Sequence, residues 1–199
     1  MKVDVKTHYD LLIEENNDPV YDSVELKNYM DKFDGDCFER ALLPLEEKTV
    51  LEIGVGTGRL AKIYAPLSHK FVGIDFSQKT IERAKENLKE VDCSLICADF
   101  LDYKFSQKFD VVYSSLTFMH IKDKQSGINK IYSLLNDNGK FVLSITKSQD
   151  VILDYGTRQV EIYPDNVYDI KSCLEKASFS VLNVFETELA FIIETKKGG

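Results

Sequence analysis

Three glycines and three acidic residues are the parts of this sequence whose types and spacing could do chemistry. Gly54, Gly56 and Gly58 follow an apolar run at every second position, where glycine permits positive φ and close approach of a ligand to the backbone. The acids stand at the ends of three apolar runs: Glu52, Asp75 and Asp99. Carboxylates around a glycine loop disfavour a pyrophosphate and favour a ligand with positive charge and hydrogen-bond donors.

The spacing of the glycines narrows the class of site. It reads G-x-G-x-G, whereas a dinucleotide site has G-x-G-x-x-G, and no Gly-Lys-Ser/Thr follows, which excludes a phosphate-binding loop. Each acid alone has a plainer interpretation: Glu52 could be a solvated sheet-edge residue, Asp75 a charge at a helix start, and Asp99 a loop-surface residue. Together they predict one site, in which Asp75 accepts hydrogen bonds from ribose hydroxyls as at other nucleoside sites of this topology.

Strands and helices alternate from about Lys48 onward, and these elements must position the site. The predicted strands are residues 48–53, 70–74, 92–97, 109–113 and 140–146, and the predicted helices are 59–65, 77–90, 123–135 and 165–177. Strand-like runs at 179–185 and 190–194 are separated by too few residues for a parallel crossover, so they should pair as an antiparallel hairpin. The predicted fold class is α/β: a doubly wound, mostly parallel, Rossmann-like sheet of seven strands with a terminal antiparallel hairpin, plus N-terminal helices.

The chain divides by pattern into residues 1–47, an N-terminal helical lead-in, and residues 48–199, the domain that carries the sheet. The lead-in shows amphipathic helical patterns at 9–15, 22–32 and 35–43. It is either a layer that covers the sheet or a lid over a ligand. The stretch 150–163 alternates around a glycine and is expected to form a flap.

The composition of the sequence limits the classes of binding partner that we expect. Of the 199 residues, 25 are Lys or Arg and 33 are Asp or Glu, and the net charge of −8 argues against nucleic acid. No run approaches the ~20 apolar residues of a membrane helix, and residues 1–6 lack the apolar core of a signal peptide, so neither a membrane partner nor export is predicted. Cys93 and Cys97 lack a second ligand pair for zinc; we predict buried free thiols, no metal and a reducing cytoplasm.

The run Val50–Gly58 resembles the class I S-adenosylmethionine-dependent methyltransferases, in particular their small-molecule branch. The resemblance covers about residues 49–197 and includes Phe109–Leu116, which is similar to the family's fourth-strand motif, and Leu134–Phe141, which is similar to its next helix–turn–strand. It implies S-adenosyl-L-methionine as the cofactor. The residues that it places against this cofactor are Glu52, Gly54, Gly56, Gly58, Asp75, Phe76, Ser77, Ala98, Asp99, Phe100, Ser114, Ser115, Leu116 and Thr117.

The same resemblance implies a role for each part of the site. The glycine loop would line the methionine portion, Asp75 would hold the ribose diol, and Asp99 would accept from the adenine amino group. Phe76 and Phe100 would pack on or beside the adenine ring, and residues 114–117 would lie beside the sulfonium. The reaction implied is SN2 transfer of a methyl group to a small-molecule acceptor, mainly through proximity and orientation.

His120, just beyond the fourth strand, is the candidate general base, or else a structural or cofactor-contacting histidine. No Asp/Asn-Pro-Pro-aromatic and no Pro-Cys nucleophile are present, which argues against DNA, glutamine and cytosine C5 as acceptors. The predicted acceptor contacts, which could equally be core or surface residues, are Tyr9, Tyr21, Tyr29, Phe33, Tyr155 and Arg158. Arg158 would meet an anionic substrate or be an exposed charge. A non-catalytic cofactor-binding protein and an NAD-dependent oxidoreductase are the alternatives, and no pattern indicates an oligomeric state.

Overall fold

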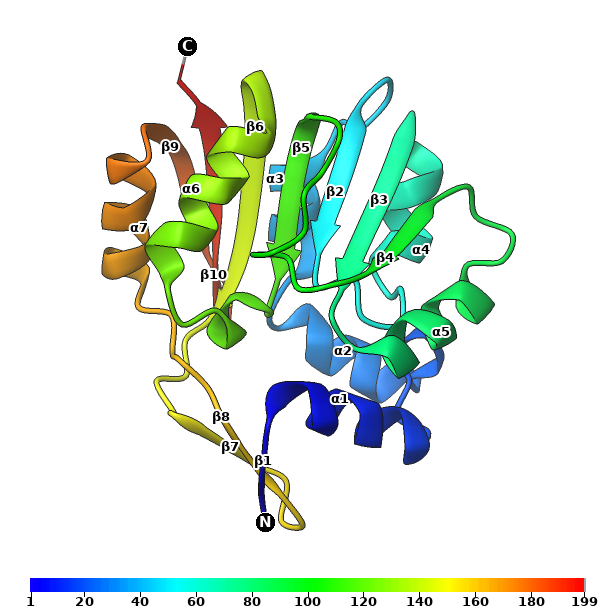
Figure 1. Cartoon of the computed structure of the whole chain (residues 1–199). Coiled ribbons are helices and arrows are strands. Elements are labelled where there is room, and N and C mark those ends of the chain that lie inside the picture. Colours follow the sequence, from blue (N-terminus) through cyan, green and yellow to red (C-terminus); the bar gives the residue numbers. More distant parts are fainter. Residues whose placement is uncertain (199) are drawn as a thin grey trace.

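The computed structural model describes residues 1–198 and arranges seven strands in one sheet of order β4–β3–β2–β5–β6–β10–β9 (Figure 1). The strands are β2 (Thr49–Ile53), β3 (Lys70–Asp75), β4 (Ser94–Cys97), β5 (Phe109–Ser115), β6 (Leu135–Thr146), β9 (Phe179–Glu186) and β10 (Ala190–Lys197). Neighbours pair in parallel, except that β10 runs antiparallel to both β6 and β9. This confirms the predicted fold class and its terminal hairpin.

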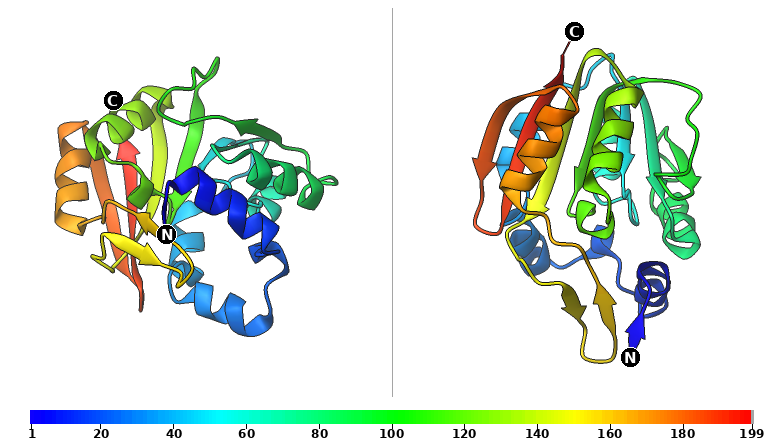
Figure 2. Two further views of the ribbon diagram at one scale, coloured as in Figure 1. Left: turned by 60° about the horizontal axis from the view of Figure 1, so that its bottom comes forward. Right: turned by 60° about the vertical axis from the view of Figure 1, so that its left-hand side comes forward.

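Helices cover both faces of the sheet (Figure 2). They are α3 (Gly35–Leu42), α4 (Ala61–Tyr64) and α5 (Gln78–Asn87) on one face, and α6 (Lys124–Leu134) and α7 (Val167–Lys176) on the other. Ile128 and Leu174 belong to the core cluster beneath α6 and α7, whereas Phe38 and Ile81 belong to the cluster beneath α3 and α5. The sheet is therefore buried on both sides, and its strand ends are left to form a site.

The first part of the lead-in lies across the carboxyl ends of the parallel strands (Figure 1), whereas its last helix, α3, covers a face of the sheet. The first part contains β1 (Lys2–Val3), α1 (Val5–Glu14), a 3-10 turn η1 (Pro19–Tyr21) and α2 (Val24–Asp31). Helix α1 begins earlier than predicted because Asp4 caps it, accepting from the amide of Thr7 at 2.8 Å. The division into a lead-in and a sheet domain remains a prediction.

The expected flap is a hairpin of β7 (Ile152–Asp154) and β8 (Gln159–Glu161), and β1 pairs with β8 in parallel to make a second, three-stranded sheet. The sequence did not predict that the N-terminal residues join the flap. The pairing fixes one end of the lead-in, because Lys2 lies beside Gln159 and Val3 beside Val160.

Several local predictions need correction. The helix expected at 59–65 is only the short α4, followed by a 3-10 turn η2 (Ala65–Leu67) that contains Pro66. Strand β6 begins at Leu135, which was predicted to end the helix at 123–135, so it also includes residues 136–139, before the strand predicted at 140–146. The prediction that Cys93 and Cys97 are buried is wrong: Cys93 is partly exposed and Cys97 is exposed, because β4 is the edge strand of the sheet.

Candidate active site

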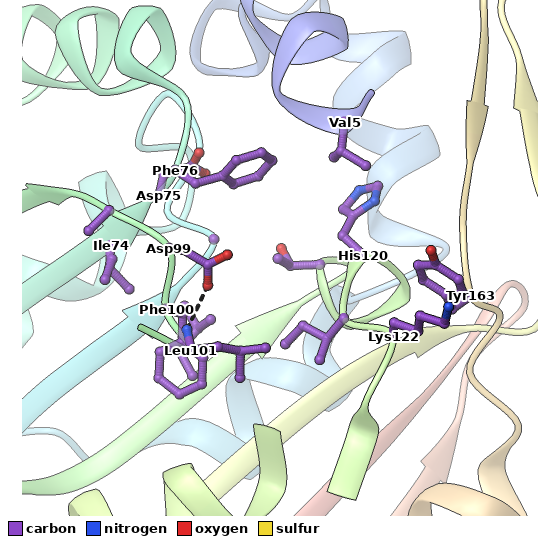
Figure 3. Close-up of a pocket in the computed structure, with 15 residues that line it drawn as sticks. Val5, Ile74, Asp75, Phe76, Asp99, Phe100, Leu101, His120, Lys122 and Tyr163 are labelled. Atoms are coloured by element: carbon purple, nitrogen blue, oxygen red, sulfur yellow. Dashed lines mark hydrogen bonds between the residues drawn. The ribbon is translucent and has the colours of Figure 1, made fainter. Parts of the chain in front are cut away.

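Two adjoining cavities lie at the carboxyl ends of the strands, where the sheet order reverses between β2 and β5. The Asp99 cavity, of about 410 Å³, is lined by Asp99 and its neighbours after β4 (Figure 3). The Glu52 cavity, of about 210 Å³, is lined by Glu52 and by residues 54–57 of the glycine loop, whereas Gly58, predicted to bind the cofactor, lines neither cavity. The residues that line both are Gly54, Asp75, Phe76, Thr117 and His120. Ligands of open α/β sheets bind at such a reversal point, so these cavities are the candidate site.

The glycine loop is held to the end of β3 by its own amides. Gly54 and Val55 both donate to the carbonyl of Ile74, at 2.9 and 3.1 Å, and the amide of Gly56 donates to Asp75 Oδ2 at 3.1 Å. The three glycines have φ of 77°, 56° and 96°, a region that is costly for other residues. The loop therefore has one fixed shape that depends on Asp75.

Asp75 ends β3 and lines both cavities. Besides Gly56, its carboxylate accepts from the amide of Ser77 at 3.0 Å, and burial raises its pKa even though these backbone donors act to lower it. Its remaining lone pairs can accept hydrogen bonds from a ligand. Ser77 is fully buried and lines neither cavity, since its hydroxyl caps α5 by accepting from the amide of Thr80.

Asp99 and Phe76 lie on one side of the Asp99 cavity, with His120 and Tyr163 on the other (Figure 3). One oxygen of Asp99 accepts from the amide of Leu101 at 2.7 Å, and within residues 1–198 the other oxygen has no hydrogen-bond partner. Ala98 and Phe100 line the same cavity, although Phe100 is only 7% exposed and belongs mostly to the core. The arrangement offers one hydrogen-bond acceptor beside apolar walls.

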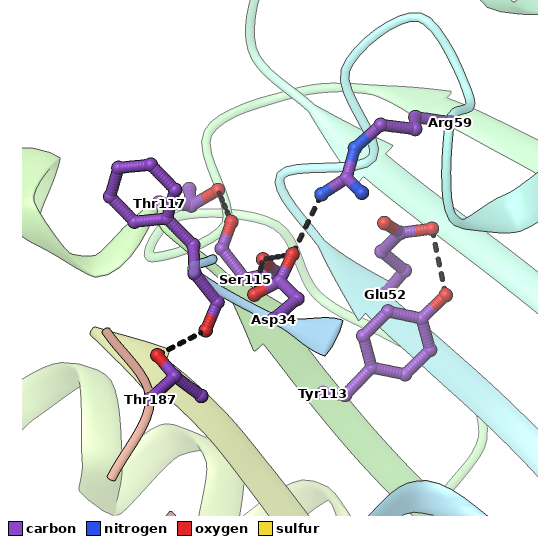
Figure 4. Close-up of polar contacts among 8 residues, drawn as sticks. Asp34, Glu52, Arg59, Tyr113, Ser115, Thr117 and Thr187 are labelled. Atoms are coloured by element: carbon purple, nitrogen blue, oxygen red, sulfur yellow. Dashed lines mark hydrogen bonds and ion pairs between the residues drawn. The ribbon is translucent and has the colours of Figure 1, made fainter. Parts of the chain in front are cut away.

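Glu52 is a buried acid, only 3% exposed, so its interpretation as a solvated edge residue is wrong. The hydroxyl of Tyr113 donates to Glu52 Oε2 at 3.0 Å (Figure 4). Burial raises the pKa of Glu52 to about 8; the Tyr113 bond and the charge of Arg59 oppose this rise, and the charges of Asp75 and Asp34 add to it. Glu52 is thus largely protonated near neutral pH until a cation faces it.

Glu52→Gln is expected to remove a pH dependence of folding stability. Because the pKa of Glu52 is about 8 in the folded chain against an ordinary 4.5, stability falls as pH rises through this window, by up to about 1.4 kcal/mol per pH unit from this group. The glutamine keeps an acceptor for Tyr113. Urea denaturation at about pH 5 and pH 7.5 should show that the free energy of unfolding falls more between these pH values in the wild type than in Glu52→Gln. Glu46→Gln, at an exposed position before β2, is the control, and equal slopes for wild type and Glu52→Gln would contradict the prediction.

The residues that follow β5 form another wall. Ser115, Leu116 and Thr117 line the Glu52 cavity, and the hydroxyl of Ser115 donates to both oxygens of Asp34 at 2.9 Å (Figure 4). Leu116 has a φ of 52°, a strained conformation of the kind that collects at ligand sites. Ser114 is fully buried, donates to a carbonyl of β2 and lines neither cavity, because successive strand residues face opposite sides.

His120 lies on a 3-10 turn, η3 (Phe118–His120), between the two cavities, and Tyr9 of α1 reaches it. The Tyr9 hydroxyl and His120 Nε2 are 3.0 Å apart. Burial lowers the pKa of His120 to about 4, and the charges of His8 and Lys124 act in the same direction, so the ring is neutral at pH 7. Within residues 1–198 its buried Nδ1 has no partner, so this nitrogen is available to a ligand.

Residues 51–143, from β2 into β6, match the family described as a methyltransferase domain. Over these residues the chain is similar to the methyltransferase family. A relative from Anoxybacillus flavithermus, named an uncharacterized methyltransferase, is 36% identical over 126 residues, which are 60% of this chain and 58% of that protein. The chain therefore spans little more than half the length of that relative.

Two solved structures share the fold of this chain over nearly its whole length. Magnesium protoporphyrin IX methyltransferase from Synechocystis PCC 6803, with bound SAH, has a TM-score of 0.75 at 17% identity and covers 98% of both chains. The cyclase SpnF has a TM-score of 0.78 at 14% identity and covers 98% of this chain and 96% of its own. At such identities the likeness is one of fold.

The predicted acceptor residues lie outside the matched methyltransferase domain, and only Tyr9 lines either cavity. Tyr21 and Tyr29 are 69% and 50% exposed. Phe33 packs edge-on against Tyr29, with ring centroids 5.6 Å apart. The lead-in therefore contributes Tyr9 to the site, and its other aromatic residues lie away from the two cavities.

Arg158 joins the flap to α1 instead of lining a cavity. It is 4% exposed, so its interpretation as an exposed charge is wrong. Its guanidinium donates to both oxygens of Glu15, at 2.6 and 2.8 Å, and to His8 Nδ1 at 2.9 Å. Tyr155 packs on His8, with centroids 4.4 Å apart. These contacts depend on the β1–β8 pairing, which brings α1 beside the flap.

Sequence reasoning missed several residues of the site. Arg59 and Met30 line the Glu52 cavity, while Lys122 and Tyr163 line the Asp99 cavity. The position of Arg59 directly after the glycine loop was an available signal. The other three come from segments whose placement depends on tertiary contacts.

Within residues 1–198 no group of three or more His, Cys, Asp or Glu side chains is arranged for a metal ion, and no helix there has the length and apolarity to cross a membrane. All four cysteines are free thiols.

Proposed function

We propose that this chain binds S-adenosylmethionine across the two cavities and transfers its methyl group to a small-molecule acceptor by SN2 displacement. One observation carries the proposal: Asp75 lines both cavities, while Asp99 lines one and Glu52 the other. Carboxylates spaced along one cleft suit a ligand with hydroxyl, amino and cationic groups and repel a pyrophosphate. The unpartnered Nδ1 of His120 between the cavities is a polar atom that such a ligand would satisfy.

The chemistry of the residues fits each part of this cofactor. Asp75 would hold the ribose hydroxyls and Asp99 the adenine amino group, with Phe76 and Phe100 as apolar walls. Glu52 would face the cationic amino-acid end. The bound cofactor supplies the methyl group together with its leaving group, so the protein is left with orientation and the exclusion of water.

Tyr9 and His120 are proposed to act on the acceptor side. Tyr9 covers the Glu52 cavity from α1 and keeps the His120 ring in one orientation through the 3.0 Å contact. The neutral imidazole can take a proton from an acceptor that loses one, and it need not act when the acceptor is already an unprotonated nucleophile. Its lowered pKa makes it a weak base, which is consistent with catalysis mainly by proximity.

Three observations support a small-molecule acceptor. The net charge is −8, the two cavities are of small-molecule size, and the motifs of the DNA and glutamine methylases are missing from the sequence after β5. The four free thiols fit the reducing compartment predicted from the sequence.

The similarity to SpnF favours one second candidate. SpnF is named for a cyclisation, so this fold also serves a protein that is not named for methyl transfer. In the second candidate, this chain binds the cofactor without transferring its methyl group.

Calorimetric titration with S-adenosylmethionine, S-adenosylhomocysteine and NADH tests the proposal, followed by a screen for S-adenosylhomocysteine release with a panel of small-molecule acceptors. We expect one equivalent of either sulfur ligand to bind, NADH not to bind, and at least one acceptor to give turnover. Failure of both sulfur ligands to bind would refute the proposal. NADH binding alone would favour an oxidoreductase, and cofactor binding without turnover would favour the second candidate.

A further inference from the structure

Helix α1 crosses the site between the flap and α5 (Figure 1). Val5 and Tyr9, one helical turn apart, line the Asp99 cavity and the Glu52 cavity respectively. Tyr9 also contacts His120, which lines both cavities. A ligand that occupies both cavities therefore lies beneath this face of α1, and its entry and release depend on how α1 is held.

The α5 side holds the lead-in through buried polar contacts. Asp10 of α1 accepts from the hydroxyl of Ser77 at 2.7 Å, and Ser77 is fully buried. Just beyond α1, Asp18 is 7% exposed and accepts from Asn87 at 3.0 Å. Asn87 also donates to the carbonyl of Thr57 in the glycine loop at 2.9 Å. This side of α1 is thus tied both to a helix that packs on the sheet and to the glycine loop.

The flap side holds α1 through two sets of contacts, which we call the clasp: the β1–β8 pairing, and the hydrogen bonds of Arg158 to α1. The pairing joins only two residues of each strand, Lys2–Val3 with Gln159–Val160. Arg158 adjoins the pairing and donates to His8 and, through two nitrogens, to Glu15. Strands this short have little stability of their own, so the clasp depends on Arg158.

The chemistry of the clasp favours its release. The side chain of Glu15 is 52% exposed, so water can hydrate its carboxylate when Arg158 withdraws. His8 is fully buried, and within residues 1–198 its Nε2 has no hydrogen-bond partner. A buried polar atom without a partner costs free energy, and exposure to water recovers that cost. Release of the clasp therefore has a gain that offsets part of what it loses.

The flap itself is fixed to the sheet domain. Lys124, in the first turn of α6, donates to the carbonyl of Tyr163 at 2.8 Å and forms an ion pair with Asp165 at 2.7 Å. The amide of Tyr163 donates to the carbonyl of Met119 at 2.8 Å. Asp165 is only 2% exposed. Because both ends of α1 meet fixed neighbours, the clasp is the place where α1 can separate.

We propose that α1 is a lid over the two cavities, and that release of the clasp moves it away from the flap while its contacts with α5 persist. In the clasped state Tyr9 lies against His120 and the site is covered. Arg158 is then a positioning residue, because it lines neither cavity and holds Tyr9 in place through α1. The movement is a property of the fold; its use in cofactor exchange rests on the proposed function.

A disulfide across the clasp tests the lid. Lys2→Cys with Gln159→Cys places thiols at exposed register partners on strands about 4.8 Å apart, within the Cα separation of about 4.4–6.8 Å that disulfides allow. Native-state hydrogen exchange should show α1 amides exchanging at least about tenfold more slowly in the oxidised than in the reduced protein. Stopped-flow displacement should show S-adenosylhomocysteine released at least about tenfold more slowly, with an affinity within about threefold. Wild type under the same oxidant controls for its four free thiols.

Arg158→Gln loosens the same clasp without a cross-link. It removes hydrogen bonds between charged groups, so α1 amides should exchange, and S-adenosylhomocysteine should be released, about tenfold faster or more. Arg158→Lys keeps the charge but not the paired hydrogen bonds, and its rates should lie in between. Lys79→Gln is the matched control, because it removes an ion pair between α5 and Glu14 of α1 and leaves the clasp intact. Both of its rates should stay within about twofold of the wild type.

The outcomes separate the lid from the proposed function. If the wild type binds no S-adenosylhomocysteine, the proposed function fails, and hydrogen exchange, which needs no ligand, still decides whether α1 opens at the clasp. Equal exchange of the α1 amides in the oxidised and reduced proteins would overturn the lid. Slower exchange with unchanged ligand release would overturn its role in cofactor exchange. The cross-linked protein is compared with its own reduced form, so a poorly folded Arg158→Gln does not prevent the test.

Discussion

Asp75→Ala is expected to weaken S-adenosylhomocysteine binding by at least about a hundredfold, whereas His120→Ala should weaken it by less than about fivefold. The carboxylate of Asp75 is the proposed acceptor for the ribose hydroxyls, and it also accepts from the amides of Gly56 and Ser77. Its removal thus deletes ligand contacts and loosens the loop that shapes the cleft. Hydrogen bonds to a charged group contribute about 1.5–3 kcal/mol each. The loss of two such bonds therefore weakens binding by more than about a hundredfold.

Two further variants separate these contributions when binding is measured by calorimetry and folding by thermal unfolding. Asp75→Asn keeps one acceptor oxygen at the same position, so we expect an intermediate loss of affinity. Asp102→Ala, on the exposed side of the turn after β4, lines neither cavity and should bind like the wild type. Equal small effects of Asp75→Ala and His120→Ala would count against the assignment of Asp75.

The framework of the site could be predicted because it depends on local patterns. Each apolar run shows where a strand ends, and parallel strands bring their carboxyl ends to one edge of the sheet. This reasoning placed Asp75, Asp99 and the glycine loop together before any tertiary contact was known. Side-chain direction was harder to predict: Ser114 and Ser115 are neighbours in the sequence, yet only Ser115 faces the cavity, because the strand alternates.

The lead-in could not be placed from the sequence, because its contacts join residues that are distant along the chain. Arg158 and Glu15 are 143 positions apart, and nothing in either local pattern marks them as partners. The same is true of Asp34, whose partner Ser115 is 81 positions away. From the sequence alone, exposed aromatic residues such as Tyr21 and Tyr29 cannot be told from residues that line a pocket. In the structure, Tyr21 in η1 and Tyr29 in α2 lie outside the two cavities.

Gly54→Ala is expected to lower the free energy of unfolding by about 2–5 kcal/mol and to abolish cofactor binding. An L residue at φ 77° costs about 1–2 kcal/mol. The added Cβ would also lie 2.2 Å from Thr117 Oγ1 and 2.4 Å from Thr117 Cγ2, an overlap that typically costs about 1–3 kcal/mol. Gly56→Ala is the matched control, because Gly56 also has a positive φ but a Cβ there would meet nothing within 4 Å. Urea denaturation of the two variants should therefore show the larger loss at Gly54.

A double variant identifies the cause of that loss. Thr117→Ala removes the two side-chain atoms nearest to the added Cβ, so Gly54→Ala combined with Thr117→Ala should be more stable than the sum of the two single losses predicts, by at least about 1 kcal/mol. The Cβ of residue 117 stays 2.7 Å from the added Cβ, so the loss that remains should lie between that of Gly54→Ala alone and that of Gly56→Ala. Additive losses would show that the overlap is not what makes this position require glycine. A recovered fold with binding still absent would instead show that Thr117, which lines both cavities, is needed in place for the ligand.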